Sequence, residues 1–330
     1  MVKPKIINLS PLTLHAIASL GGAAFDISKI DVVEVPPNLP DSTRLEAVKG
    51  ATVIFHDFSC QTRIDKNFFK AAKGTKLFQI PRVGYDDVDI DAASEFGVPV
   101  AIPTSFNAVS VAEHAMMMAL VLMRKALWLH TETSKASWHQ VKVINERIVW
   151  DMEGKTVGIV GYGAIGSEFA KRLKPFNVNI LYNKRRRLPE SEERQLGIQY
   201  ASLDEMLEKS DILSLHVPLT PETRGLIGWN EIQRMKKGAI LLNLSRGGIV
   251  DEKAVAGALR EGRLGGAGFD AHDPEPISPN SPLIGLENVL LTPHIGGASR
   301  EAAAKSVKMC FENMDRVIRG EPPINILNDL

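Results

Sequence analysis

Short apolar runs alternate with polar, helix-like segments through the first hundred residues of the chain. Each run is as long as a β-strand, and Pro, Gly or Asp follows most of them. Strand-length runs separated by helix-length segments are typical of a parallel sheet whose strands are joined by crossover helices. The pattern therefore predicts a small α/β domain, with strands at residues 5–9, 32–35, 51–55, 76–80 and 98–102.

The pattern changes near residue 105. From there to residue 129, Ala, Met and Leu recur with few helix-breaking residues, which predicts one long helix. A second series of strand-length runs follows and predicts a second doubly wound parallel sheet. Its strands are expected at residues 156–160, 179–182, 211–216, 238–244, 265–269 and 289–291.

A helix over residues 300–319 and a short terminal segment follow the second sheet. Because a segment this short cannot bury a core of its own, we expect it to pack against the first domain. The first domain would then comprise residues 1–102 and 297–330, and the second would comprise residues 103–296. The length of 330 residues also favours two domains over a single core.

The composition argues against several functional classes. Thirty-nine basic residues balance 39 acidic ones, so no net charge attracts nucleic acid or an anionic membrane surface. Cys60 and Cys310 are too few for a disulfide framework or a zinc site, which favours a reducing compartment. The first 20 residues lack the apolar core of a signal peptide, and the most apolar stretch, 115–123, is about half of a membrane span. We therefore expect a cytoplasmic protein that binds neither nucleic acid, membrane nor metal.

A glycine-rich motif follows the first strand predicted for the second domain. Gly161, Gly163 and Gly166, with Ala164 and Ile165 between the last two, have the spacing of a dinucleotide-binding turn, and a helix is expected from Ser167 onwards. The first glycine permits a tight turn, the second lets the backbone approach a pyrophosphate, and the third brings helix close to strand. The amino terminus of that helix then faces phosphate. A glycine turn without a ligand is the alternative, but the strand-to-helix context favours a dinucleotide site.

The next predicted strand ends in a basic cluster, where an NAD site normally has Asp or Glu. The residues there are Asn183, Lys184, Arg185, Arg186 and Arg187. A carboxylate would bind the ribose 2′-hydroxyl of NAD and repel a 2′-phosphate, whereas cations bind that phosphate through charge-assisted hydrogen bonds. The cluster therefore favours NADP as the cofactor, with NAD as the alternative. A solvated basic loop that binds no phosphate is a third interpretation.

Three later apolar runs are each followed by a polar group of catalytic type, namely Arg246, Glu275 and His294. Ligands bind at the carboxyl edge of an open parallel sheet, so we expect the three to converge there. Together they suit hydride transfer to a keto acid: a cation holds the substrate carboxylate, an acid protonates the carbonyl oxygen, and an anion keeps that acid protonated. Each alone is readily explained as a surface cation, a turn residue or a core histidine, but their joint placement favours catalysis.

These motifs together resemble the D-isomer-specific 2-hydroxyacid dehydrogenase family over nearly the whole chain. The resemblance implies that Arg246 binds the substrate carboxylate and carbonyl, that His294 is the general acid/base, and that Glu275 pairs with His294. It also implies that backbone amides around Val83 and Gly84 hold the substrate carboxylate from the first domain. The matching segments are 83–89, 107–113, 161–166, 216–220, 243–251 and 292–297.

The resemblance implies further contacts. Asp270 looks like the family residue that orients the nicotinamide amide, and Lys184 in place of Asp is similar to the NADPH-using glyoxylate and hydroxypyruvate reductases. Phe58 and Arg82 are expected near the substrate, where Arg82 either binds a second acidic group or caps a strand. The full set of expected cofactor contacts is Gly161, Gly163, Ala164, Ile165, Gly166, Asn183, Lys184, Arg185, Arg186, His216, Val217, Pro218, Thr223, Leu244, Ser245, Asp270, His294 and Gly296.

The sequence thus predicts an α/β fold of two Rossmann-like domains with parallel sheets and an active site in the interdomain cleft. The expected function is reduction of a small 2-keto acid, such as glyoxylate or hydroxypyruvate, to the D-2-hydroxy acid with NADPH or NADH. A phosphoglycerate-type or other dehydrogenase of the family, and a nucleotide-sensing protein similar to corepressors, are alternatives. The region matching residues 111–129 helps to form a dimer in this family, so we expect a homodimer in which Trp138 reaches the partner's site.

Overall fold

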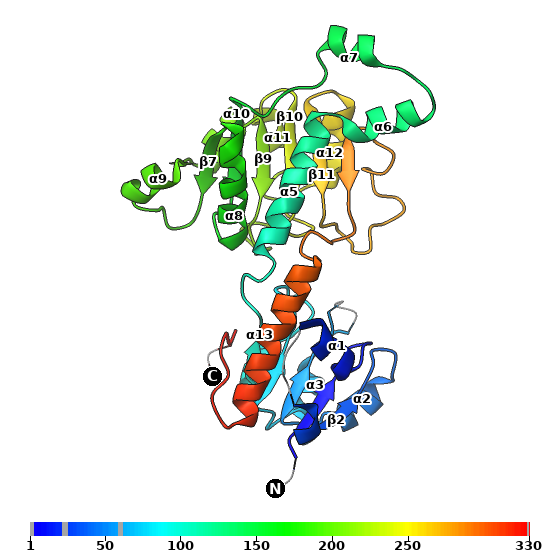
Figure 1. Cartoon of the computed structure of the whole chain (residues 1–330), viewed down its shortest axis with the longest axis vertical. Helices are drawn as coiled ribbons and strands as arrows, with labels where there is room; N and C mark the ends of the chain where they lie inside the picture. The colour runs from blue at the N-terminus through cyan, green and yellow to red at the C-terminus, as the bar shows by residue number, and fades with distance from the viewer. Residues whose placement is uncertain (1–2, 22–25, 59–61, 329) are drawn as a thin grey trace. The chain divides into compact units, whose positions relative to one another are not determined.

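The computed structural model describes residues 3–21, 26–58, 62–328 and 330. The chain divides into two compact units: a first unit of Met1–Asn107 with Ser299–Leu330, and a second unit of Ala108–Ala298. Each unit contains one parallel sheet covered by helices (Figure 1). The predicted α/β fold with two parallel sheets is confirmed.

The first unit has a five-stranded sheet in the order β2-β1-β3-β4-β5. Neighbouring residues of its strands point to opposite faces, as the period of a strand requires. Ile6 packs in the core that contains the first helix and the last one, whereas Ile7 packs in the core on the other face. The strands are β1 (Lys5–Asn8), β2 (Asp31–Glu34), β3 (Val53–Phe55), β4 (Leu77–Gln79) and β5 (Val100–Ala101). The helices are α1 (Leu14–Gly21), η1 (Ile27–Lys29), α2 (Asp41–Ala47), α3 (Lys66–Ala71), α4 (Ile90–Glu95) and α13 (Arg300–Ile318).

The C-terminal segment belongs to the first unit. Val307 and Phe311 of α13 are buried in the same core as Leu14 of α1. Beyond α13, Ile326 forms an antiparallel bridge with Ala101. The side chain of Asn328 accepts a hydrogen bond from the amide of Val100, at 2.9 Å, and donates one to the carbonyl of Val98. The terminal segment therefore pairs along the outer edge of β5.

The second unit has a seven-stranded sheet in the order β12-β11-β10-β9-β6-β7-β8. All its pairs are parallel, and the order reverses between β6 and β9, which creates the switch point where open α/β sheets bind ligands. The strands are β6 (Thr156–Val160), β7 (Asn179–Asn183), β8 (Gln199–Tyr200), β9 (Ile212–Leu215), β10 (Ala239–Asn243), β11 (Leu264–Phe269) and β12 (Val289–Leu291). The helices are α5 (Ala108–Met123), α6 (Ala126–Ser134), α7 (Gln140–Glu146), α8 (Ala164–Leu173), η2 (Lys174–Phe176), α9 (Glu190–Leu196), α10 (Leu203–Lys209), α11 (Trp229–Arg234) and α12 (Glu252–Arg260).

Two hydrophobic cores lie on opposite faces of this second sheet. Helices α5 and α8 cover one face, where Met118 and Phe169 are fully buried. Helices α10, α11 and α12 cover the other, with Met206, Ile232 and Val255 fully buried. Figure 1 shows α5 and α8 side by side across the sheet. Helix α8 follows β6, so its amino terminus lies at the carboxyl end of that strand.

The single long helix predicted over 105–129 is wrong. Helix α5 ends at Met123 and α6 begins at Ala126, because Lys125 adopts a left-handed conformation with φ of 47°. That backbone geometry cannot continue a right-handed helix. Next to the break, the exposed side chain of Arg124 pairs with Asp151 at 3.0 Å. A second difference is β8, a two-residue edge strand that the sequence analysis did not predict.

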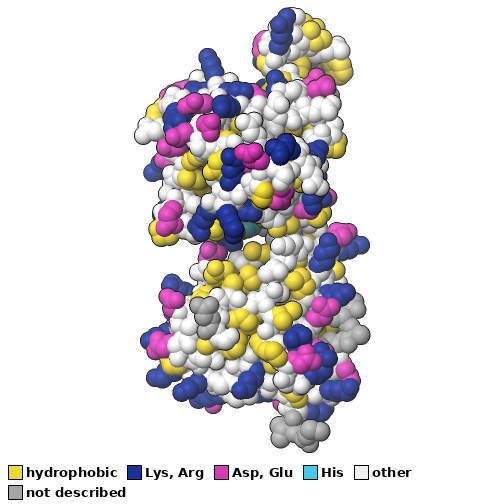
Figure 2. Space-filling model, turned by 90° about the vertical axis from the view of Figure 1, so that its left-hand side faces the viewer, with side chains coloured by type: hydrophobic (Ala, Val, Ile, Leu, Met, Phe, Trp, Pro, Cys, Tyr) yellow, Lys and Arg dark blue, Asp and Glu magenta, His cyan; other side chains and the backbone are white. Residues whose placement is uncertain are grey.

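No helix among the described residues is both long and apolar enough to cross a membrane. On the face drawn in Figure 2, basic and acidic side chains are interspersed over both units. No single sign of charge covers that face, so any attraction for an anion there arises from local groups of residues.

Candidate active site

The glycine motif forms a tight turn between β6 and α8. Gly161 has φ of +98°, and a Cβ atom there would lie 2.4 Å from the carbonyl oxygen of His216. A Cβ atom at Gly166 would lie 2.3 Å from the carbonyl oxygen of Gly161. Both positions therefore need glycine, because the turn approaches the backbone after β9 and the helix approaches the turn. Helix α8 begins at Ala164, so Ala164 and Ile165 form its first residues, three residues before the helix expected from Ser167.

Gly163 differs from the other two glycines of the motif. It is the N-cap of α8, no side chain caps the helix there, and a Cβ atom at Gly163 would meet no atom within 4 Å. The open space lies directly at the positive end of the helix dipole. A phosphate in that space would accept hydrogen bonds from the free amides of the first turn. The turn therefore fits the pyrophosphate of a dinucleotide.

Asn183, the last residue of β7, links the end of this strand to the glycine turn. Its carbonyl oxygen accepts hydrogen bonds from the amides of Gly161, at 3.1 Å, and Tyr162, at 3.0 Å. Its side-chain amide donates to the carbonyl of Ala201 at 2.9 Å. The basic residues that follow Asn183 are thereby anchored next to the turn.

Three cations of the basic cluster have uncommitted side chains. Lys184 is half-buried, while Arg185 and Arg186 are exposed. None of the three side chains forms a hydrogen bond or ion pair with another residue that the structure describes. Glu222 lies within electrostatic reach of Arg185: a hydrogen bond from Thr220, a backbone hydrogen bond and the charge of Arg185 hold its pKa below the usual range. The cluster thus presents charge that is available to an anion.

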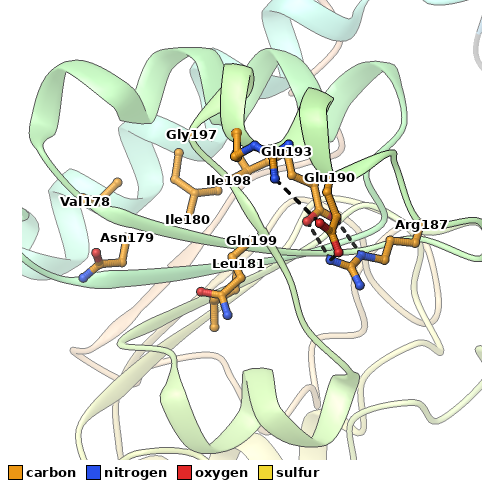
Figure 3. Close-up of a pocket in the computed structure, with 11 residues that line it drawn as sticks. Val178, Asn179, Ile180, Leu181, Arg187, Glu190, Glu193, Gly197, Ile198 and Gln199 are labelled. Atoms are coloured by element: carbon orange, nitrogen blue, oxygen red, sulfur yellow. Dashed lines mark hydrogen bonds and ion pairs between the residues drawn. The ribbon is translucent and has the colours of Figure 1, made fainter.

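Arg187, the fourth cation, has a structural partner. Its guanidinium donates two hydrogen bonds to Glu193, at 2.8 and 2.9 Å, beside a pocket formed by β7, β8 and α9 (Figure 3). The hydroxyl of Tyr182 donates to the same carboxylate at 2.8 Å. The hydrogen bonds from Arg187 lower the pKa of Glu193 to about 2, and burial raises the pKa of Tyr182 to about 12. Arg187 therefore ties α9 to the sheet and is not free for a phosphate.

The loop after β9 faces the glycine turn. His216 shares a hydrogen bond of 2.8 Å with Ser214, and burial lowers the pKa of His216 to about 4, so its ring is neutral near pH 7. A Cβ atom at Gly161 would also lie 2.9 Å from the side chain of Val217. Thr223 donates to the carbonyl of Pro218 at 2.6 Å, which closes this loop on itself. The residues predicted after β9 therefore lie at the switch point of the sheet.

Arg246 lies in a turn after β10 that Asn243 organises. The side chain of Asn243 accepts from the amide of Ser245, at 3.2 Å, and donates to the carbonyl of Arg246, at 2.9 Å. The hydroxyl of Ser245 donates to the carbonyl of Leu215 at 2.6 Å, and Leu244 is buried. The guanidinium of Arg246 donates to the carbonyl of Ser245 at 2.9 Å. The turn thus fixes the start of the Arg246 side chain at the carboxyl edge.

The turn containing Arg246 packs closely against the one containing Glu275. A Cβ atom at Gly247 would lie only 1.9 Å from the carbonyl oxygen of His272, so the two backbones touch. Glu275 accepts a hydrogen bond from the amide of His272 at 2.9 Å. This short local bond holds the carboxylate at the edge of the sheet.

Glu275 and His294 form the predicted pair. Nδ1 of His294 lies 2.8 Å from Oε2 and 3.0 Å from Oε1 of Glu275. Because Nδ1 faces the carboxylate, Nε2 is the ring nitrogen left for a substrate. The two side chains are 44% and 38% exposed, so a small molecule has access to them.

The charges around this pair favour an imidazolium. The hydrogen bond with Glu275 raises the pKa of His294, the charge of Asp270 adds to this, and burial and the positive charge of Arg246 oppose it. Burial by itself raises the pKa of Glu275, but hydrogen bonds from His294 and from the amide of His272 outweigh burial and lower it. The effect of Arg246 on His294 also places these two side chains within electrostatic reach of one another.

Asp270 holds the loop that carries His294. Its buried carboxylate accepts hydrogen bonds from the hydroxyl of Thr292 at 2.6 Å, from the amide of Ile295 at 2.9 Å and from the amide of Gly296 at 2.8 Å. Thr292 was not among the predicted site residues, although the segment that begins with it was. His114 was also missed, and its Nε2 lies 3.0 Å from the hydroxyl of Thr292.

The predicted substrate residues of the first unit cluster around the loop after β4. Arg82 donates to Asp87 at 2.7 Å, to the carbonyl of Asp57 at 3.3 Å and to the carbonyl of Gly84. Of the two interpretations of Arg82, these contacts favour the structural one. The amides of Val83 and Gly84 donate no hydrogen bond to another residue that the structure describes.

Phe58 is half-buried, with its ring 6.0 Å from that of Phe55. Cys60 lies outside the described residues. Within the described part of the chain, no group of three His, Cys, Asp or Glu residues is arranged to hold a metal ion.

Comparison with known proteins gives a consistent result. The family model described as D-isomer specific 2-hydroxyacid dehydrogenase, NAD binding domain, matches residues 116–296. A glyoxylate reductase of Korarchaeum cryptofilum is 39% identical over 269 residues, which are 80% of this chain and 80% of that protein. A D-3-phosphoglycerate dehydrogenase of Archaeoglobus fulgidus is 36% identical over 81% of this chain, but this chain spans only 50% of its length.

The solved structures agree. The crystal structure of a glyoxylate reductase from Paecilomyes thermophila superimposes with a TM-score of 0.84 and 28% sequence identity. The match covers 99% of this chain and 99% of that one.

Proposed function

Because this chain belongs to the D-isomer specific 2-hydroxyacid dehydrogenase family, we propose that it reduces a small 2-keto acid, such as glyoxylate or hydroxypyruvate, to the D-2-hydroxy acid. The observation that carries the proposal is the Glu275–His294 pair, 2.8 Å apart, within electrostatic reach of Arg246. A proton donor, its stabilising anion and a cation for a carboxylate are the groups that this reduction needs.

We assign each residue a role from the chemistry that the reduction needs. Arg246 is proposed to bind the substrate carboxylate through its planar guanidinium, and the backbone amides of Val83 and Gly84 are proposed as further substrate contacts. The reduced nicotinamide, when bound, supplies the hydride that adds to the carbonyl carbon. His294 gives the proton on Nε2 to the carbonyl oxygen and becomes neutral, and Glu275 stabilises the imidazolium before the transfer. Hydride plus proton convert the ketone to the alcohol, so the step balances.

We propose NADPH as the preferred cofactor. A 2′-phosphate placed beyond β7 would meet Lys184, Arg185 and Arg186, whose charges no described residue neutralises by direct contact. No carboxylate follows β7 to bind a ribose 2′-hydroxyl, because Lys184 stands at that position. Asp270 is proposed to contact the nicotinamide amide in addition to the loop amides that it already holds.

Arg82 bears on the size of the substrate. Its guanidinium is committed to Asp87 and to two carbonyl groups, and its side chain is only 11% exposed. It is therefore a poor partner for a phosphate on the substrate. This favours a short keto acid over the phosphoglycerate-type alternative.

We also propose that the active form is a homodimer. The segment containing α6 and α7 carries four exposed apolar side chains, Leu127, Trp138, Val141 and Ile144, which are 46–75% exposed. Apolar side chains gathered on one segment indicate a contact surface. A second copy of the chain would cover them, and light scattering of the Trp138→Ser variant against the unaltered protein tests this. A cytoplasmic location is proposed from the two-cysteine composition alone.

The decisive experiment is a panel of keto acids with NADPH and NADH, followed by nicotinamide absorbance. Glyoxylate and hydroxypyruvate should be turned over faster than pyruvate or 3-phosphohydroxypyruvate, and His294→Ala should remove activity while retaining cofactor binding. Faster turnover of phosphohydroxypyruvate would favour the phosphoglycerate-type alternative. Cofactor binding without turnover of any keto acid would favour the nucleotide-sensing alternative.

A further inference from the structure

His114 belongs to helix α5, which contributes no residue to the glycine turn or to the Arg246 and Glu275 turns. Its side chain nevertheless reaches the loop of the general acid. Nε2 of His114 lies 3.0 Å from the hydroxyl of Thr292 and 3.7 Å from Oδ1 of Asp270. The side chain is only 13% exposed, and its Cβ atom would lie 3.6 Å from a Cβ atom placed at Gly296. The helix therefore packs directly against residues 292–296.

The direction of these hydrogen bonds is fixed by the atoms involved. The Thr292 hydroxyl has a single proton, which it donates to Asp270 at 2.6 Å. It can only accept from His114, so Nε2 of His114 carries a proton. His114 thus donates to Thr292, and Thr292 donates to Asp270. The carboxylate of Asp270 also accepts from the amides of Ile295 and Gly296.

His294 lies between the two ends of this network and has φ of +55°. A non-glycine residue keeps such a conformation only where its surroundings hold it there. Thr292 holds the loop before His294, and the two amides bound to Asp270 hold the loop after it. The orientation of Nδ1 towards Glu275 therefore depends on both sides of the network.

We propose that His114 is a positioning residue for the general acid, acting through Thr292 and Asp270 to keep His294 aligned with Glu275. This inference rests on the proposed function of His294. Without the donor on His114, the Thr292 hydroxyl loses one of its two hydrogen bonds, and residues 292–296 become more mobile. His294 then spends less time against Glu275. The charged groups facing His294 are Glu275, Asp270 and Arg246, and only the first two favour its protonated form.

The test compares His114→Leu with His114→Gln, since a glutamine side chain retains an N–H donor near the position of Nε2. His114→Leu should lower kcat for keto-acid reduction by about tenfold to a hundredfold, a part of the roughly 10²- to 10⁴-fold share of general acid catalysis. KM for the keto acid and the affinity for NADPH should change little, because Arg246 and the glycine turn are untouched. The alkaline limb of the reduction profile should move to lower pH. His114→Gln should restore most of both effects.

Glu113→Gln provides the matched control. Glu113 neighbours His114 on α5 but pairs with Arg172 of α8, away from the loop, so its loss should leave kcat and the pH profile unchanged. Thr292→Val should reproduce the His114→Leu defect, and the double variant should be no worse than either single one. Melting temperatures of all variants identify any that fail to fold.

The inference is overturned if His114→Leu keeps the parental kcat and pH profile, or if His114→Gln is as impaired as His114→Leu. Additive effects of His114→Leu and Thr292→Val would also overturn it. His294→Ala separates the two hypotheses: reduction that persists in this variant refutes the proposed function, whereas its loss beside a normal His114→Leu refutes only the positioning role.

Discussion

Replacing Gly161 with alanine should destabilise the second unit. The new Cβ atom would lie 2.4 Å from the carbonyl oxygen of His216 and 2.9 Å from the side chain of Val217. The carbonyl of His216 cannot relax easily, because it is backbone that directly follows the buried central strand β9. The φ of +98° adds strain that glycine does not have.

The magnitude follows from these two contributions. A residue held in a sparsely populated backbone region costs about 1–3 kcal/mol, and overpacking a filled site costs about 1–3 kcal/mol more. The free energy of unfolding should therefore fall by about 2–6 kcal/mol. For a unit of this size each kcal/mol lowers Tm by about 2–4 °C, so thermal unfolding followed by circular dichroism should show a fall of about 4 °C or more.

Gly163→Ala is the control for this substitution, because its Cβ atom would meet nothing within 4 Å and φ is −95°. Its Tm should be unchanged or slightly higher. NADPH binding should weaken, since loss of a hydrogen bond to a charged phosphate costs about 1.5–3 kcal/mol, or about 10- to 150-fold in Kd. An unchanged Tm for Gly161→Ala would refute the steric reasoning. An unchanged Kd for Gly163→Ala would show that the open space does not receive the pyrophosphate.

Three further predictions concern the chemistry of the site. In Glu275→Gln the pKa of His294 should fall, because the partner that raises it is lost; the alkaline limb of kcat/KM for reduction should move to lower pH while oxidation of the hydroxy acid is spared, and a stationary limb would contradict the pairing. Lys184→Asp combined with Arg185→Ala should shift the ratio of kcat/KM for NADPH and NADH towards NADH, and an unchanged ratio would support a merely solvated loop. Arg246→Lys should lower kcat/KM for the keto acid by orders of magnitude with cofactor Kd retained; the opposite pattern would show that Arg246 serves the cofactor.

The sequence was most informative where a requirement is local. The strand period, the glycine spacing and the positions of Arg246, Glu275 and His294 after strands depend on neighbouring residues, and the structure places all three side chains at the carboxyl edge of one sheet. The break at Lys125 was not predictable, because Lys and Ala are both good helix formers. The left-handed conformation of Lys125 has no local sequence signal such as a glycine or a proline.

Contacts between distant segments could not be predicted, because a sequence pattern reports only on neighbouring residues. Arg187 and Arg82 look like free cations in the sequence, and only the fold shows that Glu193 and Asp87 bind them. His114 and Thr292 are 178 residues apart, so no local pattern relates them. Helix propensity and motif spacing predict which side chains lie at the carboxyl edge of the sheet. The packing of helices on the sheet decides which residues become their hydrogen-bond and ion-pair partners.

The discontinuity of the first unit has a consequence for how the chain acquires its structure. Synthesis proceeds from the N-terminus, and domains generally fold as they emerge. The apolar face that contains Ile6, Phe55 and Leu77 cannot be covered until α13 has been synthesised. The edge strand β5 likewise lacks its partner Asn328, which lies 228 residues after Val100. The intervening residues 108–298 form a unit of their own, and closing a longer loop costs only about 0.6 kcal/mol per doubling. The long separation therefore affects the kinetics of folding more than the stability of the folded unit. Until residues 299–330 have been synthesised, one apolar face of the first sheet stays exposed to solvent. In that period chaperones can bind it and other unfolded chains can aggregate with it.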